Sequence, residues 1–380
     1  YKDRILVPGL DGRLVALSAK TGTELWSEQA TPAGADDHIT LAPRIVGRNV
    51  VIGNSGGEAP VRGFVSAYDA ETGQLAWRFY TVPGDPARGF ENSAMKKAAA
   101  TWSGEWYRLG GGGTVWDAVS YDPDLNLVYV GTGNGGPWPE QLRHSRGQDN
   151  LYIASVVALE ADTGAYRWHY QFTPGDSWDY DATQQLTLAD LRIGGRNRKV
   201  IMQANKNGFF YVLDRTDGSF ISAEPYARVN WARGIDATGR PRVNPDARYG
   251  EQPVCVLPSS AGPHNIEPMS FNPRTGLVYV PIKDPSGEYF SVDSTFAYTP
   301  GRNNTGARRG RGDSCPPAAS GQPNGEEARS GGIPTPIIGP VRTPPEGHRN
   351  WLIAWDPVAQ AERWRVLGSG TVDGGTETTA

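Results

Sequence analysis

Two short segments of the sequence place an oxygen-bearing side chain directly after small residues. Gly53-Asn-Ser-Gly-Gly-Glu58 follows a Val-Val-Ile run and ends in a carboxylate, and Gly131-Thr-Gly-Asn134 presents an amide oxygen in a similar setting. Small residues at such positions let a ligand approach the backbone closely. Both segments are therefore candidates for a binding site.

Two further segments carry charge. Trp178-Asp179-Tyr180-Asp181 holds two carboxylates two residues apart, and Lys206 precedes the apolar run Gly208-Phe-Phe-Tyr-Val-Leu. Because the side chains of an extended segment alternate with a period of two, Asp179 and Asp181 are predicted to lie on one side of the chain. A cation and two acids then become available to the same site.

The oxygens of Glu58, Asn134 and Asp179 form a ligand set suited to a hard cation. Calcium and similar ions prefer carboxylate and amide oxygens, whereas zinc prefers the His and Cys clusters that these segments lack. Taken singly, each residue also has an ordinary interpretation as a solvated turn, a turn residue or one half of an ion pair, and Lys206 as a surface charge. The four segments have to be judged together.

The elements that would position these segments are indicated by a repeated pattern. An apolar strand containing Ala leads into a Thr-Gly turn and a second strand that ends in Trp, ten residues after the Ala. The copies span residues 16–26, 67–77 and 158–168; a fourth, 354–364, lacks Thr-Gly, and partial copies occur at 212–218 and 271–276.

Each copy is predicted to be a β-hairpin whose glycine adopts a positive φ and whose tryptophan docks on the neighbouring unit. Such units cannot bury their faces alone and stack around an axis, which favours an all-β propeller over a β-sandwich with incidental turns. Trp26 and Trp77 are 51 residues apart, whereas Trp77 and Trp168 are 91 apart, a separation that we interpret as two units with an insertion around 83–115. Five to six blades are expected.

Composition excludes several classes of function. The net charge is −4, and Lys and Arg are scattered apart from the run 308–311, so no nucleic-acid binding is expected. No window of 18 apolar residues is present, so no membrane-spanning segment is expected. No signal peptide opens this chain, and its terminus leaves export open. The insertion is expected to carry a short helix, and residues 300–345 to form a long surface loop.

Cys255 and Cys315 are too far apart for a zinc or haem motif; they form one disulfide or stay free.

The quoted segments resemble those of pyrroloquinoline quinone (PQQ) dependent methanol and alcohol dehydrogenases, the quinoproteins. The resemblance runs nearly end to end, through residues 56–63, 67–73, 77–84, 111–117, 131–135, 149–152, 173–180 and 206–211. It implies a propeller that has eight blades in the family. Residues 1–380 are then expected to form a single propeller domain, a fragment that lacks blades at both its N- and C-terminal ends.

The resemblance also implies roles for individual residues. Asp179 corresponds to the catalytic base, Trp116 to the indole that stacks under the quinone, and Lys206 to the cation that contacts its oxygens. Residues matching those that hold the cofactor's carboxylates are Thr40, Ser55, Gly56 and Gly57, and those matching the metal ligands are Glu58, Asn134 and Asp179. Asp181 stands where lanthanide-type members carry a second Asp, so a lanthanide is expected in preference to calcium.

The activity implied is oxidation of a small primary or secondary alcohol to an aldehyde or ketone. PQQ would accept the hydride, the metal would act as a Lewis acid, and a cytochrome c or similar acceptor in the periplasm would receive the electrons. One alternative is a non-catalytic propeller scaffold, which would lack the set Glu58, Trp116, Asn134 and Asp179. The other is an inactive fragment of such an enzyme.

Overall fold

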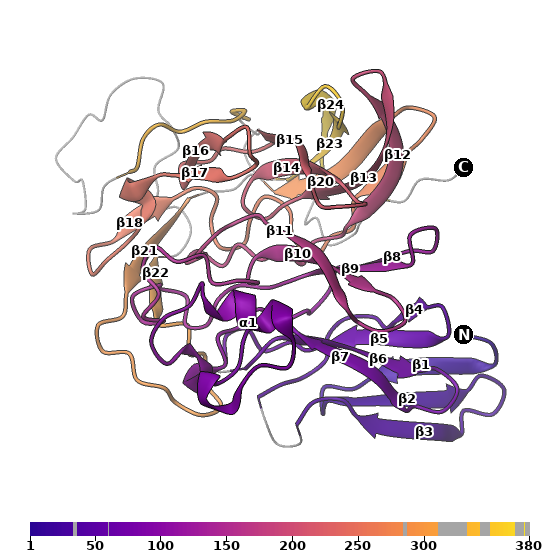
Figure 1. Cartoon of the computed structure of the whole chain (residues 1–380). Coiled ribbons are helices and arrows are strands. Elements are labelled where there is room, and N and C mark those ends of the chain that lie inside the picture. The colour runs from indigo at the N-terminus through magenta and orange to yellow at the C-terminus, as the bar shows by residue number, and fades with distance from the viewer. Residues whose placement is uncertain are drawn as a thin grey trace.

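The structure is a computed structural model, and it describes residues 1–32, 36–59, 61–283, 287–310, 333–342, 350–368 and 376. Within these residues the main architecture is a series of five antiparallel sheets. In the first four the strands follow one another along the chain, whereas in the fifth two strands of another sheet intervene. Figure 1 shows the sheets in succession, from the N-terminal sheets in indigo to the C-terminal sheet in orange and yellow. The propeller expectation is confirmed, with five blade-like sheets in the described part.

The first three sheets occupy the N-terminal half of the chain. The first has three strands and the next two have four. The first contains β1 (Arg4–Pro8), β2 (Arg13–Ser18) and β3 (Glu24–Gln29); the second β4 (Arg44–Val46), β5 (Asn49–Gly53), β6 (Phe64–Asp69) and β7 (Leu75–Tyr80); the third β8 (Val119–Asp122), β9 (Leu127–Gly131), β10 (Ser155–Glu160) and β11 (Tyr166–Gln171).

The fourth and fifth sheets have four strands each. They contain β12 (Thr187–Ile193), β13 (Arg196–Ala204), β14 (Phe209–Asp214) and β15 (Phe220–Pro225), and β19 (Ser270–Asn272), β20 (Leu277–Lys283), β23 (Asn350–Asp356) and β24 (Ala361–Leu367). Contacts join β4 to β8, β8 to β12, and β12 to β19, which are the first strands of four successive sheets. These first strands therefore lie nearest the common axis.

The ten-residue offset from Ala to Trp is explained by strand pairing. Ala16 pairs with Trp26, Ala67 with Trp77, and Ala158 with Trp168, and the register of each hairpin shifts directly after the alanine. The same offset and shift recur at Ala354 and Trp364. A bulge of this kind strengthens the local twist, so the repeat specifies both the pairing and the curvature of each sheet.

The tryptophans dock on turn glycines of the next sheet, as predicted. A Cβ added at Gly73 would lie 2.8 Å from the Trp26 ring, one at Gly164 would lie 2.6 Å from Trp77, and one at Gly218 would lie 2.5 Å from Trp168. All three glycines have a positive φ, between 68° and 78°. Conformation and space thus both require glycine at these turns.

The interval between Trp77 and Trp168 holds one sheet, so the prediction of two units there is wrong. Much of the extra length belongs to the predicted insertion, which carries η1 (Pro86–Arg88), α1 (Ser93–Ala99) and η2 (Trp106–Leu109). The expected helix is α1, and the side chain of Asn92 caps it by accepting a hydrogen bond from Met95 N at 3.0 Å.

Two shorter sheets also form in the described part, and two strands of the second are inserted in the chain between the second and third strands of the fifth blade. These sheets pair β16 (Ala232–Ile235) with β17 (Pro241–Val243), followed by η3 (Pro245–Ala247), and β18 (Val254–Val256) with β21 (Glu288–Val292) and β22 (Ala307–Gly310). β22 falls in the stretch 300–345 that was expected to be entirely loop. Much of that stretch, including Cys315, lies outside the described residues, and Cys255 is buried and disulfide-bonded. No helix in the described part is long and apolar enough to cross a membrane.

Candidate functional site

One pocket, with a volume of about 310 Å³, collects all ten residues that the sequence singled out. They are Thr40, Ser55, Gly56, Gly57, Glu58, Trp116, Asn134, Asp179, Asp181 and Lys206. His38 and Asn265 complete the lining and were missed by the sequence analysis. The structure brings the ten residues together, while their individual roles stay predictions.

The antiparallel order of the sheets explains this convergence. Thr40, Trp116, Asp179 and Asn265 each precede the first strand of a sheet, whereas Glu58, Asn134 and Lys206 follow the second strand. The start of one strand and the end of its antiparallel partner lie at the same end of a sheet. Loops from four sheets therefore meet at one end of the axis, and Asn265 was identifiable by its place before β19.

Lys206 links the two aspartates of the pocket. Its Nζ donates to Asp179 Oδ2 at 2.9 Å and to Asp181 Oδ2 at 2.8 Å, and the side chains of Lys206, Asp179 and Asp181 are 4%, 13% and 4% exposed. Asp179 has a φ of 66°, so the segment is not extended. The two carboxylates reach one ammonium because the chain turns at Asp179, and the predicted alternation along a strand is wrong.

The electrostatics of the pocket are dominated by burial and by excess negative charge. Burial raises the pKa of Asp179 well above its ordinary value; Lys206 opposes this, while Asp181 and Glu58 add to it. Burial lowers the pKa of Lys206, but Asp179 and Asp181 outweigh that effect and raise it overall. One ammonium and three carboxylates line the pocket, so a bound cation would offset charge that Lys206 alone does not.

Asn134 is held so that its amide oxygen faces a glycine. Its backbone N donates to Asp181 Oδ1 at 2.7 Å, and its Nδ2 donates to Gly135 O at 3.1 Å. A Cβ at Gly57 would lie 2.8 Å from Asn134 Oδ1, and Gly56 has a φ of 110°. The glycine pair therefore leaves an uncrowded approach to an oxygen donor.

A hydroxyl pair ties the Ser55 segment to the backbone of Trp116. Thr40 Oγ1 donates to Trp116 O at 3.2 Å and lies 2.5 Å from Ser55 Oγ, which acts as the donor when Thr40 donates to Trp116. Two buried polar atoms nearby, Thr114 Oγ1 and Asn265 Oδ1, have no hydrogen-bond partner in the described part of the chain. Of these two residues, Asn265 lines the pocket, so its amide oxygen is available to a ligand.

The oxygen donors fit a hard cation by their chemistry, but the carboxylates do not form a ready-made cage. Across the described ranges, no group of three or more His, Cys, Asp and Glu side chains could hold a metal ion. The set of Glu58, Asn134, Asp179 and Asp181 includes an amide, and Lys206 already contacts two of its carboxylates. A cation entering this site would share the aspartates with Lys206.

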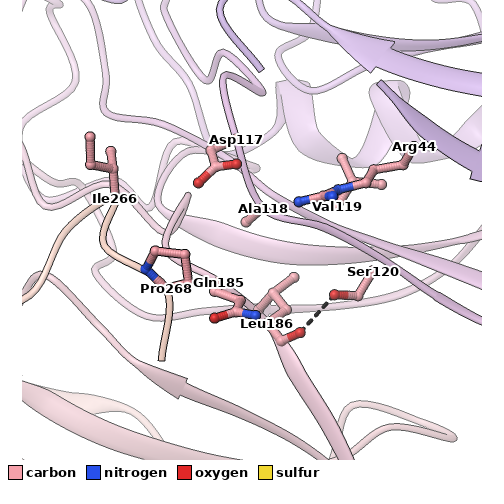
Figure 2. Close-up of a pocket in the computed structure, with 9 residues that line it drawn as sticks. All are labelled: Arg44, Asp117, Ala118, Val119, Ser120, Gln185, Leu186, Ile266 and Pro268. Atoms are coloured by element: carbon pink, nitrogen blue, oxygen red, sulfur yellow. Dashed lines mark hydrogen bonds between the residues drawn. The ribbon is translucent and has the colours of Figure 1, made fainter. Parts of the chain in front are cut away.

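A second pocket, of about 430 Å³, lies along the same first strands (Figure 2). Its polar side chains come from Arg44 of β4, Asp117 before β8, Ser120 of β8 and Gln185 before β12. Trp116 lines the first pocket and Asp117 the second, so adjacent residues serve two cavities. Burial raises the pKa of Asp117 to about 6, with Arg44 acting in the opposite direction. No motif in the sequence pointed to this pocket.

Comparison with known proteins gives a consistent picture. The model of the PQQ family described as glucose/ethanol/alcohol dehydrogenase, beta-propeller domain, matches residues 1–225. A quinohemoprotein alcohol dehydrogenase of Pseudomonas putida is 50% identical over the whole chain, which covers 51% of that protein. The chain spans about half the length of the curated relatives it matches.

Two solved structures share the architecture. The quinohemoprotein alcohol dehydrogenase of Comamonas testosteroni is 44% identical with a TM-score of 0.86; the match covers 100% of this chain and 54% of that one. A europium-containing methanol dehydrogenase is 33% identical with a TM-score of 0.79, and the match covers 96% of this chain and 60% of that one.

Proposed function

Because this chain belongs to the PQQ-dependent alcohol dehydrogenase family, we propose that it oxidises a small primary or secondary alcohol to an aldehyde or ketone in the pocket around Asp179. The observation that carries the proposal is the convergence on one cavity of ten residues that come from widely separated segments of the sequence. A non-catalytic scaffold has no need of a buried cluster of charges, which is costly to maintain.

PQQ would be held by Trp116 as a flat platform, by Thr40, Ser55, Gly56 and Gly57 at its carboxylates, and by Lys206 at its quinone oxygens. When bound, PQQ would supply the hydride acceptor for the alcohol, and a bound cation would supply Lewis-acid chemistry. Lys206 is buried and ion-paired, so it supplies a fixed positive charge. The Thr40 hydroxyl fixes the backbone oxygen of Trp116 and thereby the platform.

Asp179 is the proposed base that takes the hydroxyl proton of the alcohol. Its pKa is raised by burial, and a carboxylate with a raised pKa accepts a proton more readily than an exposed one. The hydrogen bond from Lys206 keeps the carboxylate directed into the pocket. The proton would remain on the Asp179 carboxyl until solvent removes it.

The metal ligands proposed are Glu58, Asn134, Asp179 and Asp181, and the proposed ion is a lanthanide in preference to calcium. Two features support this choice: the second aspartate adds negative charge, which a trivalent ion gains more from than a divalent one, and a structural relative contains europium. Each Asp181 oxygen accepts one hydrogen bond and retains a lone pair for a cation.

The electrons would leave through a partner. A reduced quinone has to be reoxidised before the next turnover, so the reaction needs an electron acceptor. We therefore propose a cytochrome c or similar acceptor as the partner and the periplasm as the compartment, in line with the family.

The decisive experiment replaces the proposed base. Asp179→Asn in the PQQ- and metal-loaded protein should lower kcat by about a thousandfold or more, the scale lost with a general base, while the melting temperature stays within a few degrees. Turnover close to that of the unmodified protein would remove Asp179 from the mechanism. The metal is tested with the unmodified apo-protein and with Asp181→Ala, each loaded with PQQ and with either calcium or a light lanthanide. Equal activity in these four samples contradicts the lanthanide assignment.

A further inference from the structure

The proposed base is held in a conformation that its side chain does not favour. Asp179 has a φ of 66°, in the left-handed region that residues with a Cβ rarely adopt. It follows the buried Trp178 and precedes the buried Tyr180, so it cannot relax into solvent. Other parts of the structure must hold the backbone in place.

A carboxylate three residues upstream contacts the backbone on both sides of Asp179. Asp176 Oδ1 accepts hydrogen bonds from Trp178 N at 3.1 Å and from Tyr180 N at 3.2 Å, and Asp176 Oδ2 lies 3.2 Å from the same Tyr180 N. These two amides flank residue 179. Rotation about its φ or ψ would displace at least one of them from the carboxylate.

Asp176 is itself fixed by the core. It is 1% exposed, and its backbone oxygen accepts from Nη2 of the buried Arg143 at 2.6 Å. Burial raises the pKa of Asp176, whereas the two backbone amides and Arg143 lower it. Arg248 braces the preceding turn by donating to Gly175 O at 2.7 Å, and its guanidinium lies 4.5 Å from the Trp178 ring centroid.

We propose that Asp176 is a positioning residue for the reaction: by binding the amides of Trp178 and Tyr180 it holds Asp179 in the left-handed conformation that directs the Asp179 carboxylate at Lys206 and into the pocket. Its kinetic consequence rests on the proposed function, whereas its conformational consequence does not. Asp176 lies outside the pocket lining.

The chain contains a matched control for this contact. Asp236 Oδ1 accepts from Thr238 N at 2.8 Å and from Arg240 N at 3.0 Å, the same i+2 and i+4 pattern. Asp236 lies in the turn between β16 and β17, and its hairpin lines neither pocket. Substitution there removes the same kind of turn without touching the Asp179 segment.

The experiment compares Asp176→Ala with Asp236→Ala. The crystal structure of the apo-protein should show residue 179 leaving positive φ, and its contact with Lys206 lost, in Asp176→Ala alone. In the PQQ- and metal-loaded protein, kcat should fall about 30-fold or more with KM for the alcohol changed by less than about threefold, because a displaced base weakens the transition state more than the bound substrate. Asp236→Ala should leave both constants unchanged.

A second variant guards against misfolding. Asp176→Asn keeps one acceptor oxygen, so it should retain the fold and a kcat between those of Asp176→Ala and the unmodified protein. The proposal is overturned if residue 179 keeps its positive φ and its contact with Lys206 in both variants, or if kcat is unchanged in both while Asp179→Asn is inactive. If Asp176→Ala moves residue 179 but Asp179→Asn remains active, the positioning role stands and the assignment of the base fails.

Discussion

The periphery and the centre of this molecule differ in how often each contact is used. At the periphery one contact recurs: a tryptophan of one sheet covers the turn glycine of the next, at Gly73, Gly164 and Gly218. At the centre each residue is used once, and the pocket joins loops from four sheets. The repeated contact is apolar and depends on shape, whereas the single site depends on charge and on oxygen donors.

The two regions are therefore expected to contribute in opposite ways to stability. Burying a tryptophan against a neighbouring sheet is favourable, on the order of 2–3 kcal/mol for a side chain of this size. Burying Lys206 with Asp179 and Asp181 is unfavourable unless every charge is paired. The tryptophan contacts of the periphery stabilise the fold, and this stabilisation offsets the free-energy cost of the charged cluster at the centre. Changes of the same chemical kind at the two places test this difference.

The largest effect on stability is expected from Gly164→Ala. The added Cβ would lie 2.6 Å from the Trp77 ring, and the φ of 68° is unfavourable for alanine. The free energy of unfolding should fall by about 3 kcal/mol, in line with overpacking combined with backbone strain, while kcat per folded, loaded molecule stays unchanged. Denaturant titration and turnover measured on the same sample check both parts.

Gly194→Ala is the matched control, because Gly194 has a φ of 56° but a Cβ added there would meet nothing within 4 Å. Its free energy of unfolding should fall by about 1–2 kcal/mol, from backbone strain alone. Equal losses in the two variants would show that docking on Trp77 contributes nothing to the cost.

A smaller effect, and on function rather than stability, is expected from Gly57→Ala. The new Cβ would lie 2.8 Å from Asn134 Oδ1, and the φ of Gly57 is not in the positive range. Affinity for the proposed cation should fall about tenfold to a hundredfold, or 1.4–2.7 kcal/mol, with the melting temperature nearly unchanged. Calorimetric titration of the apo-protein measures the affinity. If the variant had a much lower melting temperature but an unchanged affinity for the ion, Gly57 would matter for stability and not for binding, which contradicts the proposed difference between centre and periphery.

The smallest effect is expected from Asp117→Asn in the second pocket. The folded pKa of Asp117, about 6, exceeds the ordinary value of 3.8, so its contribution to stability is present below about pH 4 and is lost as the pH rises through about 6. Relative to the unmodified protein, the variant should gain about 1–2 kcal/mol between pH 4 and pH 7, because pocket water screens part of the effect. Urea unfolding at several pH values tests this; a difference independent of pH contradicts it.

The periphery was predictable from the sequence because the motif that makes its contacts recurs several times along the chain. A ten-residue offset from Ala to Trp recurs wherever the two residues pair across a hairpin, so the pattern can be counted. The spacing between repeats was a poor guide to the number of sheets. The 91 residues from Trp77 to Trp168 hold one sheet and the insertion with α1, since a loop can lengthen without changing how the strands pair.

The centre was predictable only in part. Its ten residues lie on one pocket, but their arrangement depends on backbone conformations that a single occurrence in the sequence does not reveal. Asp179 and Asp181 were expected on one side of an extended segment, whereas both meet Lys206 because the chain turns at Asp179. Asp117 was missed because its raised pKa comes from burial between strands far apart in sequence.

The docking of tryptophan on glycine has a direction, since each described contact runs from a sheet to the one that follows it along the chain. The series of sheets therefore resembles a one-dimensional lattice with nearest-neighbour coupling. A defect at one boundary would lower the cooperativity of unfolding there and leave the other boundaries intact. Local unfolding, and with it the exchange of amide protons, would begin at the weakest boundary between two sheets and extend to the neighbouring sheets in order.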